Sequence, residues 1–199
     1  MLCRNLPAGR YLLEGTVNGA SSANDWLANK ERAPLPLLLA EAEASRAVDE
    51  TPPLFINGVS GLGAPFWVSS LESRFVGAGS RGARVLAVLE SIAFLLQVNL
   101  EELAPHGPPL TGLLVTGGLS ANEYLCACLA SLSGLAVRRA GDPEATARGL
   151  ARLVAGDDAR AWPLPAVEVR LPTPDPALRL RYRRWRTEVD GAIAGLGAA

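Results

Sequence analysis

A short apolar run that ends in two glycines lies near the middle of the chain, and it reads Leu113-Leu114-Val115-Thr116-Gly117-Gly118. Three consecutive apolar residues bounded by turn residues predict a strand that ends before the glycines. Because glycine has no Cβ, the backbone N–H groups of this turn stay accessible to a ligand. A phosphate, a sugar or the edge of a base could therefore approach the turn closely.

The next residues, Leu119-Ser120-Ala121-Asn122, predict the start of a helix that runs to about Ser133. We expect Ser120 to cap this helix and Glu123 to complete a capping box. Asn122 would lie on the first helical turn, where its amide can hydrogen-bond a purine edge or a ribose. The competing interpretation is that the two glycines only let the strand and the helix pack closely.

Strands and helices alternate on both sides of this turn, which predicts an α/β layer architecture. We expect residues 84–103 to form the main helix, with Glu90 outside its apolar stripe, and residues 144–155 to form a core helix. The proline-rich residues 162–176 are expected to cross the surface. The remaining expected elements are strands at 10–15, 54–56 and 135–139 and helices around Trp26, at 35–47 and at 177–196.

The composition limits the classes of protein to which the chain can belong. The 199 residues include 19 Lys and Arg against 20 Asp and Glu, which gives a formal net charge of −1. This balance excludes the strongly basic surface of a dedicated nucleic-acid binder. A hydrophobic share of 49% excludes disorder as the dominant state. We expect a main domain at residues 1–160, with residues 161–199 adding a proline-rich crossing and an amphipathic helix packed on it.

Few residues suit metal or nucleophilic chemistry. The spacing of Cys3, Cys126 and Cys128 fits no metal site, and His106 is the one histidine. We therefore predict no metal site and no catalytic residue in this chain. Three cysteines cannot all pair, which favours a reducing, cytoplasmic setting. The N-terminal sequence does not resemble a signal peptide. The apolar stretch at residues 85–103 is expected to be too short and too polar to span a membrane.

Two patterns suggest a ligand but have simpler explanations. Residues 77–82, Gly-Ala-Gly-Ser-Arg-Gly, match the GxGxxG dinucleotide fingerprint. The acidic residue that the fingerprint needs about 20 positions on would be Glu101 or Glu102, still inside a helix. We expect a flexible turn into a helix instead. The arginines at residues 179–186 could contact nucleic acid, but the apolar stripe between them favours an amphipathic helix with a solvated basic face.

Five motifs occur in a characteristic order and spacing. They are Leu13-Glu14-Gly15 with Trp26-Leu27, Gly61-Leu62-Gly63-Ala64-Pro65-Phe66-Trp67, Leu89-Glu90-Ser91-Ile92-Ala93, the glycine turn through Asn122, and Glu144-Ala145-Thr146-Ala147-Arg148-Gly149. This set, over residues 9 to 156, resembles the C-terminal domain of the FGGY carbohydrate kinases. That group contains glycerol kinase, xylulokinase and gluconokinase.

The resemblance implies a ribonuclease-H-like, actin-type ATPase fold, with a mixed sheet flanked by helices. It implies the C-terminal half of a two-domain kinase, which holds the adenosine half of ATP or ADP; Mg²⁺ accompanies the nucleotide in the complete enzyme. By position, Gly117, Gly118 and Asn122 match residues that contact the adenosine and the α-phosphate region. Ser21 and Asp25 match positions that face the nucleotide.

The sequence departs from the family pattern at three places. Thr116 stands where many members have Asp, Ser21 stands where a glycine is usual, and residues 71–73, Leu-Glu-Ser, replace Ala-Arg-Gly. No particular sugar or polyol is therefore implied as the substrate. The family's N-terminal domain carries the sugar site, the catalytic aspartate and the first phosphate loop. We expect these to be missing here, and the second phosphate loop to lie just upstream of Met1.

Two functional hypotheses follow from the resemblance. The leading one is half of a carbohydrate kinase that binds nucleotide weakly and transfers no phosphate alone, since transfer needs Mg²⁺, a base and charge stabilisation together. A separate N-terminal chain or a homo-oligomer could complete it. The alternative is a non-catalytic interaction or regulatory module that retains the fold. The kinase hypothesis predicts that Asn122→Ala lowers ADP affinity without lowering stability.

Overall fold

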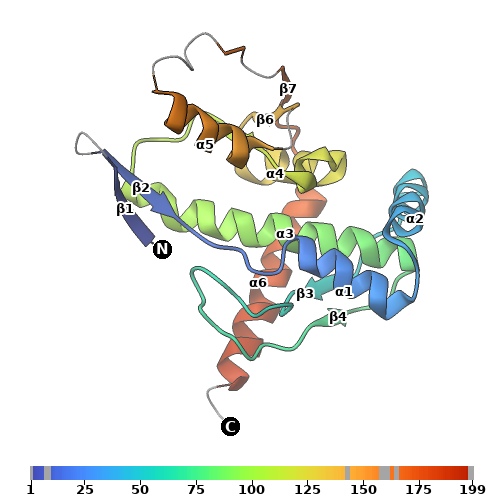
Figure 1. Cartoon of the computed structure of the whole chain (residues 1–199). Coiled ribbons are helices and arrows are strands. Elements are labelled where there is room, and N and C mark those ends of the chain that lie inside the picture. Colours follow the sequence, from blue (N-terminus) through green and yellow to red (C-terminus); the bar gives the residue numbers. More distant parts are fainter. Residues whose placement is uncertain (1, 7–9, 142–143, 157–161, 164–165, 197–199) are drawn as a thin grey trace. The chain divides into compact units, whose positions relative to one another are not determined.

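The computed structural model describes residues 2–6, 10–141, 144–156, 162–163 and 166–196. The chain divides into two compact units, one of Met1–Pro108 with Asp175–Ala199 and one of Pro109–Pro174. Figure 1 labels the elements of both units. The domain boundary expected at residue 160 stays a prediction.

The first unit is mainly helical and contains two antiparallel strand pairs. β1 pairs with β2, and β3 pairs with β4 so that Phe55 lies opposite Phe75. Trp26 packs against both phenylalanine rings, with ring centroids 5.1 and 6.2 Å away. The elements are β1 (Leu2–Leu6), β2 (Arg10–Glu14), α1 (Ser21–Glu31), α2 (Leu35–Ala47), β3 (Leu54–Ile56), β4 (Arg74–Val76), α3 (Arg81–Leu103), a short 3-10 helix (Ala104–His106) and α6 (Pro176–Leu196).

α3 is the central helix of the first unit. Ser80 caps it, because the Ser80 Oγ accepts a hydrogen bond from the Ala83 N–H at 3.1 Å. Every residue from 85 to 95 is buried. By length and composition α3 could cross a membrane, so the expectation that it is too short and too polar is wrong; it begins at Arg81, earlier than expected. However, 78% of its most apolar window is buried inside the protein, and core packing accounts for its apolar character.

The last glycine of the GxGxxG match, Gly82 in the first turn of α3, is explained by packing. A Cβ on Gly82 would overlap the carbonyl oxygen of Glu41, so α2 and α3 can approach this closely only because the residue is glycine. Arg81 and Glu41 form a two-pronged ion pair across the same interface. α3 then continues through residues 101 and 102. The interpretation as a turn into a helix is confirmed, since a dinucleotide fingerprint needs a second strand there.

Buried amide side chains join several motifs within the first unit. Asn99 of α3 donates a hydrogen bond to the Ala64 carbonyl oxygen at 3.0 Å, and a Cβ on Gly15 would overlap the Asn99 Oδ1. Asn57 donates to the Gly19 carbonyl oxygen at 2.8 Å. These contacts connect the loop after β3 with the chain after β2 and with α3. The glycines of these motifs therefore have structural roles.

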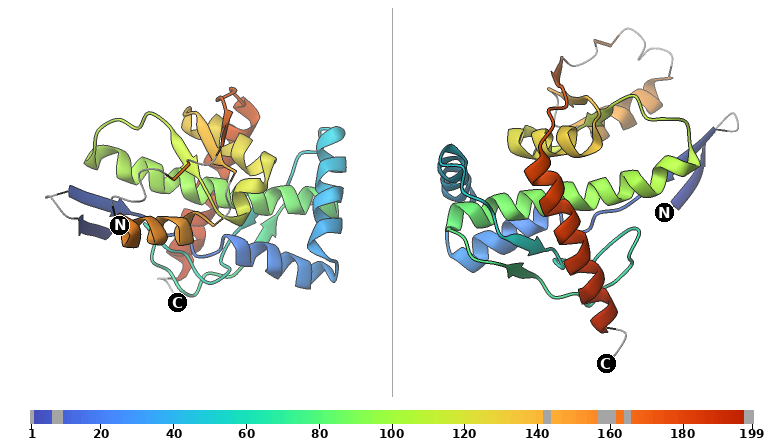
Figure 2. Two further views of the ribbon diagram at one scale, coloured as in Figure 1. Left: turned by 45° about the horizontal axis from the view of Figure 1, so that its top comes forward. Right: turned by 180° about the vertical axis from the view of Figure 1, so that it is seen from behind.

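α6 crosses α3 and contacts β3, as two opposite views show (Figures 1 and 2). Trp185 is fully buried, and its Nε1–H donates to the Phe55 carbonyl oxygen at 2.9 Å. Arg181 donates to both carboxylate oxygens of Glu90, at 2.5 and 3.0 Å. Glu90 is only 1% exposed. The expectation that Glu90 lies outside the buried face of α3 is therefore wrong, because an arginine from a distant helix allows this carboxylate to be buried.

The second unit contains a mixed three-stranded sheet. β5 and β6 are parallel, whereas β6 and β7 are antiparallel. α4 contacts β6 and β7. The elements are β5 (Leu113–Val115), a 3-10 helix (Gly118–Ala121), α4 (Glu123–Ser133), β6 (Val137–Ala140), α5 (Ala145–Ala155) and β7 (Val167–Arg170).

Two expectations for the second unit are wrong. The segment of residues 162–176 was expected only to cross the surface, but it contains β7, which pairs with β6 along four residues. α5 was expected to be a core helix, but none of its residues is buried and Leu153 is 82% exposed. The apolar periodicity of α5 identified the helix correctly, but the structure leaves its apolar residues uncovered.

We expect Arg181→Met to lower the free energy of unfolding by about 3 kcal/mol or more, because it leaves the Glu90 carboxylate buried without this arginine. Arg183→Met removes the same charge from the exposed side of α6 and should change the free energy of unfolding by less than about 0.5 kcal/mol. Urea denaturation followed by circular dichroism measures both. Equal stability of the two variants would show that the ion pair does not anchor α6.

Candidate functional site

The glycine turn, residues 116–122, joins β5 to α4 in the second unit. Gly117 has φ 85° and ψ 177°, a conformation that is almost restricted to glycine. Ser120 closes the turn, because its N–H and its Oγ–H both donate to the Gly117 carbonyl oxygen, at 3.0 and 2.6 Å. Ser120 is therefore not the helix cap that we expected. It lies within the 3-10 helix that precedes α4.

Asn122 is the N-cap of α4. Its Oδ1 accepts a hydrogen bond from the Leu125 N–H at 2.9 Å. The side chain is half-buried, and the cap occupies its carbonyl oxygen. Its NH₂ group is consequently the part that suits donation to a ligand. The expectation that Asn122→Ala leaves stability unchanged is inconsistent with this capping bond, since loss of an N-cap typically costs about 1 kcal/mol.

The space beside the glycines bears on the two interpretations of the turn. A Cβ built on Gly117 or on Gly118 would meet no atom within 4 Å. Neither glycine is therefore required for close packing of a strand against a helix in the described structure. Gly117 is required by its backbone conformation, whereas the φ of Gly118 lies outside the positive range. At Gly118 neither packing nor backbone conformation in the described structure requires a glycine.

Ser21 and Asp25 lie in the first unit, on α1. Ser21 is the first residue of the helix and Asp25 follows one turn later, so the two exposed side chains share a face. The α1 N-terminus has no side-chain cap. Its N–H groups can therefore donate hydrogen bonds to a ligand, and the helix dipole favours a negatively charged one. The structure thus places the three residues of the glycine turn together in one unit and the two residues of α1 together in the other.

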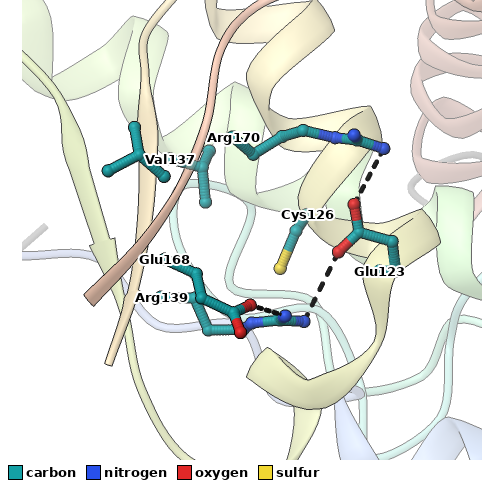
Figure 3. A pocket seen from close by; sticks show the side chains of 7 residues that line it. Glu123, Cys126, Val137, Arg139, Glu168 and Arg170 are labelled. Carbon is teal, nitrogen blue, oxygen red and sulfur yellow. Dashed lines mark hydrogen bonds and ion pairs between the residues drawn. The ribbon is translucent and has the colours of Figure 1, made fainter. Parts of the chain in front are cut away.

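Four charged side chains gather next to the glycine turn, and we call them the Glu123 cluster (Figure 3). They are Glu123 of α4, Arg139 of β6, and Glu168 and Arg170 of β7. With Cys126 and two valines they line a cavity of about 110 Å³. Burial raises the pKa of the Cys126 thiol, which favours the neutral form. The hydrogen bond to Glu168 raises the pKa of Arg139.

The Glu123 cluster was not predicted from the sequence, although one signal for it was present. Residues 167–170, Val-Glu-Val-Arg, alternate apolar and charged side chains with the period of a half-buried strand. The prolines around this stretch favoured a surface crossing instead. The described residues include no group of three or more His, Cys, Asp or Glu side chains that could hold a metal ion.

We expect Gly117→Ala to lower the free energy of unfolding by about 1–3 kcal/mol, because alanine is strained at this φ and ψ. Gly118→Ala should not lower it by more than about 0.5 kcal/mol, since its Cβ enters open space. Thermal unfolding of the two variants beside the unchanged chain measures this difference. A destabilised Gly118→Ala would reveal a packing role for Gly118 after all.

Comparison with known protein families extends these observations. A sequence model of the FGGY family of carbohydrate kinases, C-terminal domain, matches residues 2–156. The glycerol kinases of Synechocystis sp. and Mycoplasmopsis pulmonis are 36% and 34% identical to this chain over 150 residues. The matches cover 71% and 72% of this chain but 29% of each relative. The chain thus spans less than a third of the length of these curated relatives.

Three solved structures share the fold. Plasmodium falciparum glycerol kinase, determined with ADP, has a TM-score of 0.75 at 23% identity, over 92% of this chain and 38% of that chain. Lactobacillus acidophilus gluconate kinase has a TM-score of 0.78 at 19% identity, over 98% of this chain and 43% of that one. The ligand-bound xylulose kinase of the same organism has a TM-score of 0.71 at 20% identity, over 99% of this chain and 42% of that chain. These likenesses confirm the expected actin-like ATPase fold. The match to residues 2–156 shows that the chain belongs to the FGGY family of carbohydrate kinases and corresponds to the family's C-terminal domain.

Proposed function

We propose that this chain is the nucleotide-binding half of an ATP-dependent carbohydrate kinase, and that the glycine turn holds the adenosine part of ATP or ADP. The observation that supports this most is the open space beside Gly117 and Gly118, which no packing requirement in the described structure explains. A glycine that is needed neither for packing nor for its φ is well explained by a ligand that lies against the backbone.

Each proposed contact has a chemical reason. The bare backbone of the turn lies close to the N-terminus of α4, where an α-phosphate or a sugar oxygen is favourably placed. The NH₂ group of Asn122 would donate to a purine nitrogen or a ribose oxygen. The Asp25 carboxylate would accept from ribose hydroxyls, and Ser21 would contact the nucleotide at the uncapped end of α1. The hydroxyl of Ser21, where a glycine is usual, would narrow the pocket or add a hydrogen bond.

Phosphate transfer needs more than this chain is proposed to supply. The γ-phosphate must be held in line with the acceptor hydroxyl by Mg²⁺ and further positive groups, and a base must receive the hydroxyl proton. We assign those parts, and the sugar or polyol site, to an N-terminal half. The chain covers 29% of its glycerol kinase relatives, which leaves ample length for such a half. A longer polypeptide, a separate chain or a second copy could provide it.

A non-catalytic interaction module is the second candidate function, and α5 is the observation that favours it. Leu150, Leu153 and Val154 are 64%, 82% and 82% exposed on this helix. Neighbouring exposed apolar side chains favour association with another protein. In that case the fold would be retained for contact, and nucleotide would have no effect on the chain.

We expect ADP to bind the purified chain and Asn122→Ser to weaken that binding by about fivefold or more, through loss of one hydrogen bond. Serine is also a good N-cap, so this variant should unfold at an unchanged temperature. Gly118→Ala should weaken binding by about tenfold or more, because its Cβ occupies the proposed ligand space. Titration calorimetry gives the affinities, and thermal unfolding shows that the variants remain folded.

Gly191→Ala is the matched control for the glycine change. Gly191 lies on α6, and a Cβ there would also meet no atom within 4 Å. It should leave ADP affinity unchanged. If the folded chain bound no ADP at millimolar concentration, nucleotide binding by this chain alone would be contradicted and the interaction module would be the better hypothesis.

The chain alone should transfer no phosphate from ATP to glycerol, xylulose or gluconate in the presence of Mg²⁺. The proposed site holds the adenosine end of the nucleotide and contributes no base. A coupled assay for ADP release with each acceptor measures this. ADP release by the purified chain that is faster with an acceptor than without one would contradict the proposal that this chain is half of an enzyme.

A further inference from the structure

The Glu123 cluster links three elements of the second unit. Glu123, at the start of α4, accepts ion pairs from Arg170 at 2.8 Å and from Arg139 at 3.4 Å. Arg139 also pairs with Glu168. The register of β6 and β7 makes this possible, because Arg139 lies opposite Glu168 and Val137 lies opposite Arg170. Residues directly opposite across a strand pair share one face of the sheet.

The same cluster reaches the glycine turn. The guanidinium of Arg139 donates to the Ser120 carbonyl oxygen at 3.5 Å, and the Cys126 thiol donates to the same oxygen at 3.4 Å. Ser120 is the residue that closes the turn onto Gly117. Glu123 is joined directly to Asn122, the cap of α4. Two parts of the turn are therefore connected to charged groups on β6 and β7.

β7 lies outside the part of the chain that the family model matches, which ends at residue 156. The strand nevertheless supplies two of the four members of the cluster. Its contribution is thus a feature of this chain that the family match does not describe.

We propose that Arg139 and Arg170 are positioning residues, which hold the glycine turn and the N-terminus of α4 in place through Glu123 and Ser120. The part of this inference that concerns the turn rests on the contacts described above. The part that concerns nucleotide affinity also rests on the proposed function. The strand β7 would thereby contribute to nucleotide affinity without touching the nucleotide.

The alternative use of these residues is a separate ligand site in the cavity that they line. Each arginine already pairs with a carboxylate, and Figure 3 shows these pairs along the cavity. An anionic ligand would have to displace a glutamate. The cluster is therefore better suited to hold the turn in position than to bind a second ligand.

The individual contacts are modest, so the expected effect is modest too. Exposed ion pairs contribute little singly, but several charges that share partners reinforce one another. Arg139 is the shared member, and its side chain is only 25% exposed. Coupling between residues in one network commonly changes an equilibrium by roughly fivefold.

The test compares Arg139→Met and Arg170→Met with Arg138→Met. Arg138 lies on the same strand as Arg139, is exposed and lies opposite Leu114 and Val169, outside the cluster. Hydrogen exchange at the amides of Ser120, Asn122 and Leu125 reports on the turn without any nucleotide. We expect roughly fivefold faster exchange in both cluster variants and no change in Arg138→Met. High salt should speed exchange more in the unchanged chain than in Arg139→Met, because salt screens the ion pairs and the variant retains the Arg170–Glu123 pair but not the pairs of Arg139.

ADP titration of the same proteins tests the nucleotide part of the inference. Arg139→Met should weaken ADP binding by roughly fivefold, and its effect should not add to that of Asn122→Ser, since both act on one turn. Unchanged exchange at the turn in Arg139→Met and Arg170→Met would overturn the positioning role. Faster exchange in a chain that binds no ADP would retain the positioning role and contradict the proposed function. Faster exchange with unchanged ADP affinity would overturn the link between β7 and the nucleotide.

Discussion

The burial of α3 is the constraint on which the rest of the first unit depends. A helix with a continuous buried run from residue 85 to 95 needs partners on several sides, and α2, β3 and α6 all contact it or its neighbours. Two features make this possible. Gly82 lets the backbone of α2 approach, and Arg181 neutralises the buried Glu90. Without Gly82 the two helices could not approach this closely, and without Arg181 the Glu90 carboxylate would lie in the core without this positive partner.

Much of the fold could be predicted from the sequence, and the failures have a common cause. The apolar period identified α2, β3, β5, α5 and α6 nearly to the residue. Pattern alone could not show that Glu90 is buried, because its arginine lies 91 positions later. It also could not show that α5 is uncovered, because periodicity gives the apolar face of a helix and not what covers it. β7 was missed because prolines near it outweighed a four-residue alternation.

The candidate site shows the same division between local and distant information. The glycine pair and Asn122 were identifiable from their order after a strand. The 3-10 helix that moves the cap from Ser120 to Asn122 was not, because both residues are good caps and only the hydrogen bonds distinguish them. The consequence is chemical. Asn122 has one oxygen for the helix and one NH₂ group for the proposed ligand, so the two roles can be separated by substitution.

The discontinuity of the first unit has a consequence for how the protein is made. Residues 109–174 lie between the two segments of that unit in the sequence. During synthesis, α3 leaves the ribosome long before α6 exists, and its apolar surface and Glu90 stay without Trp185 and Arg181 until then. The second unit is local in sequence and can form as it emerges. The first unit cannot be completed before α6 is made, and in that interval the part of α3 that α6 covers stays open to chaperones and to aggregation.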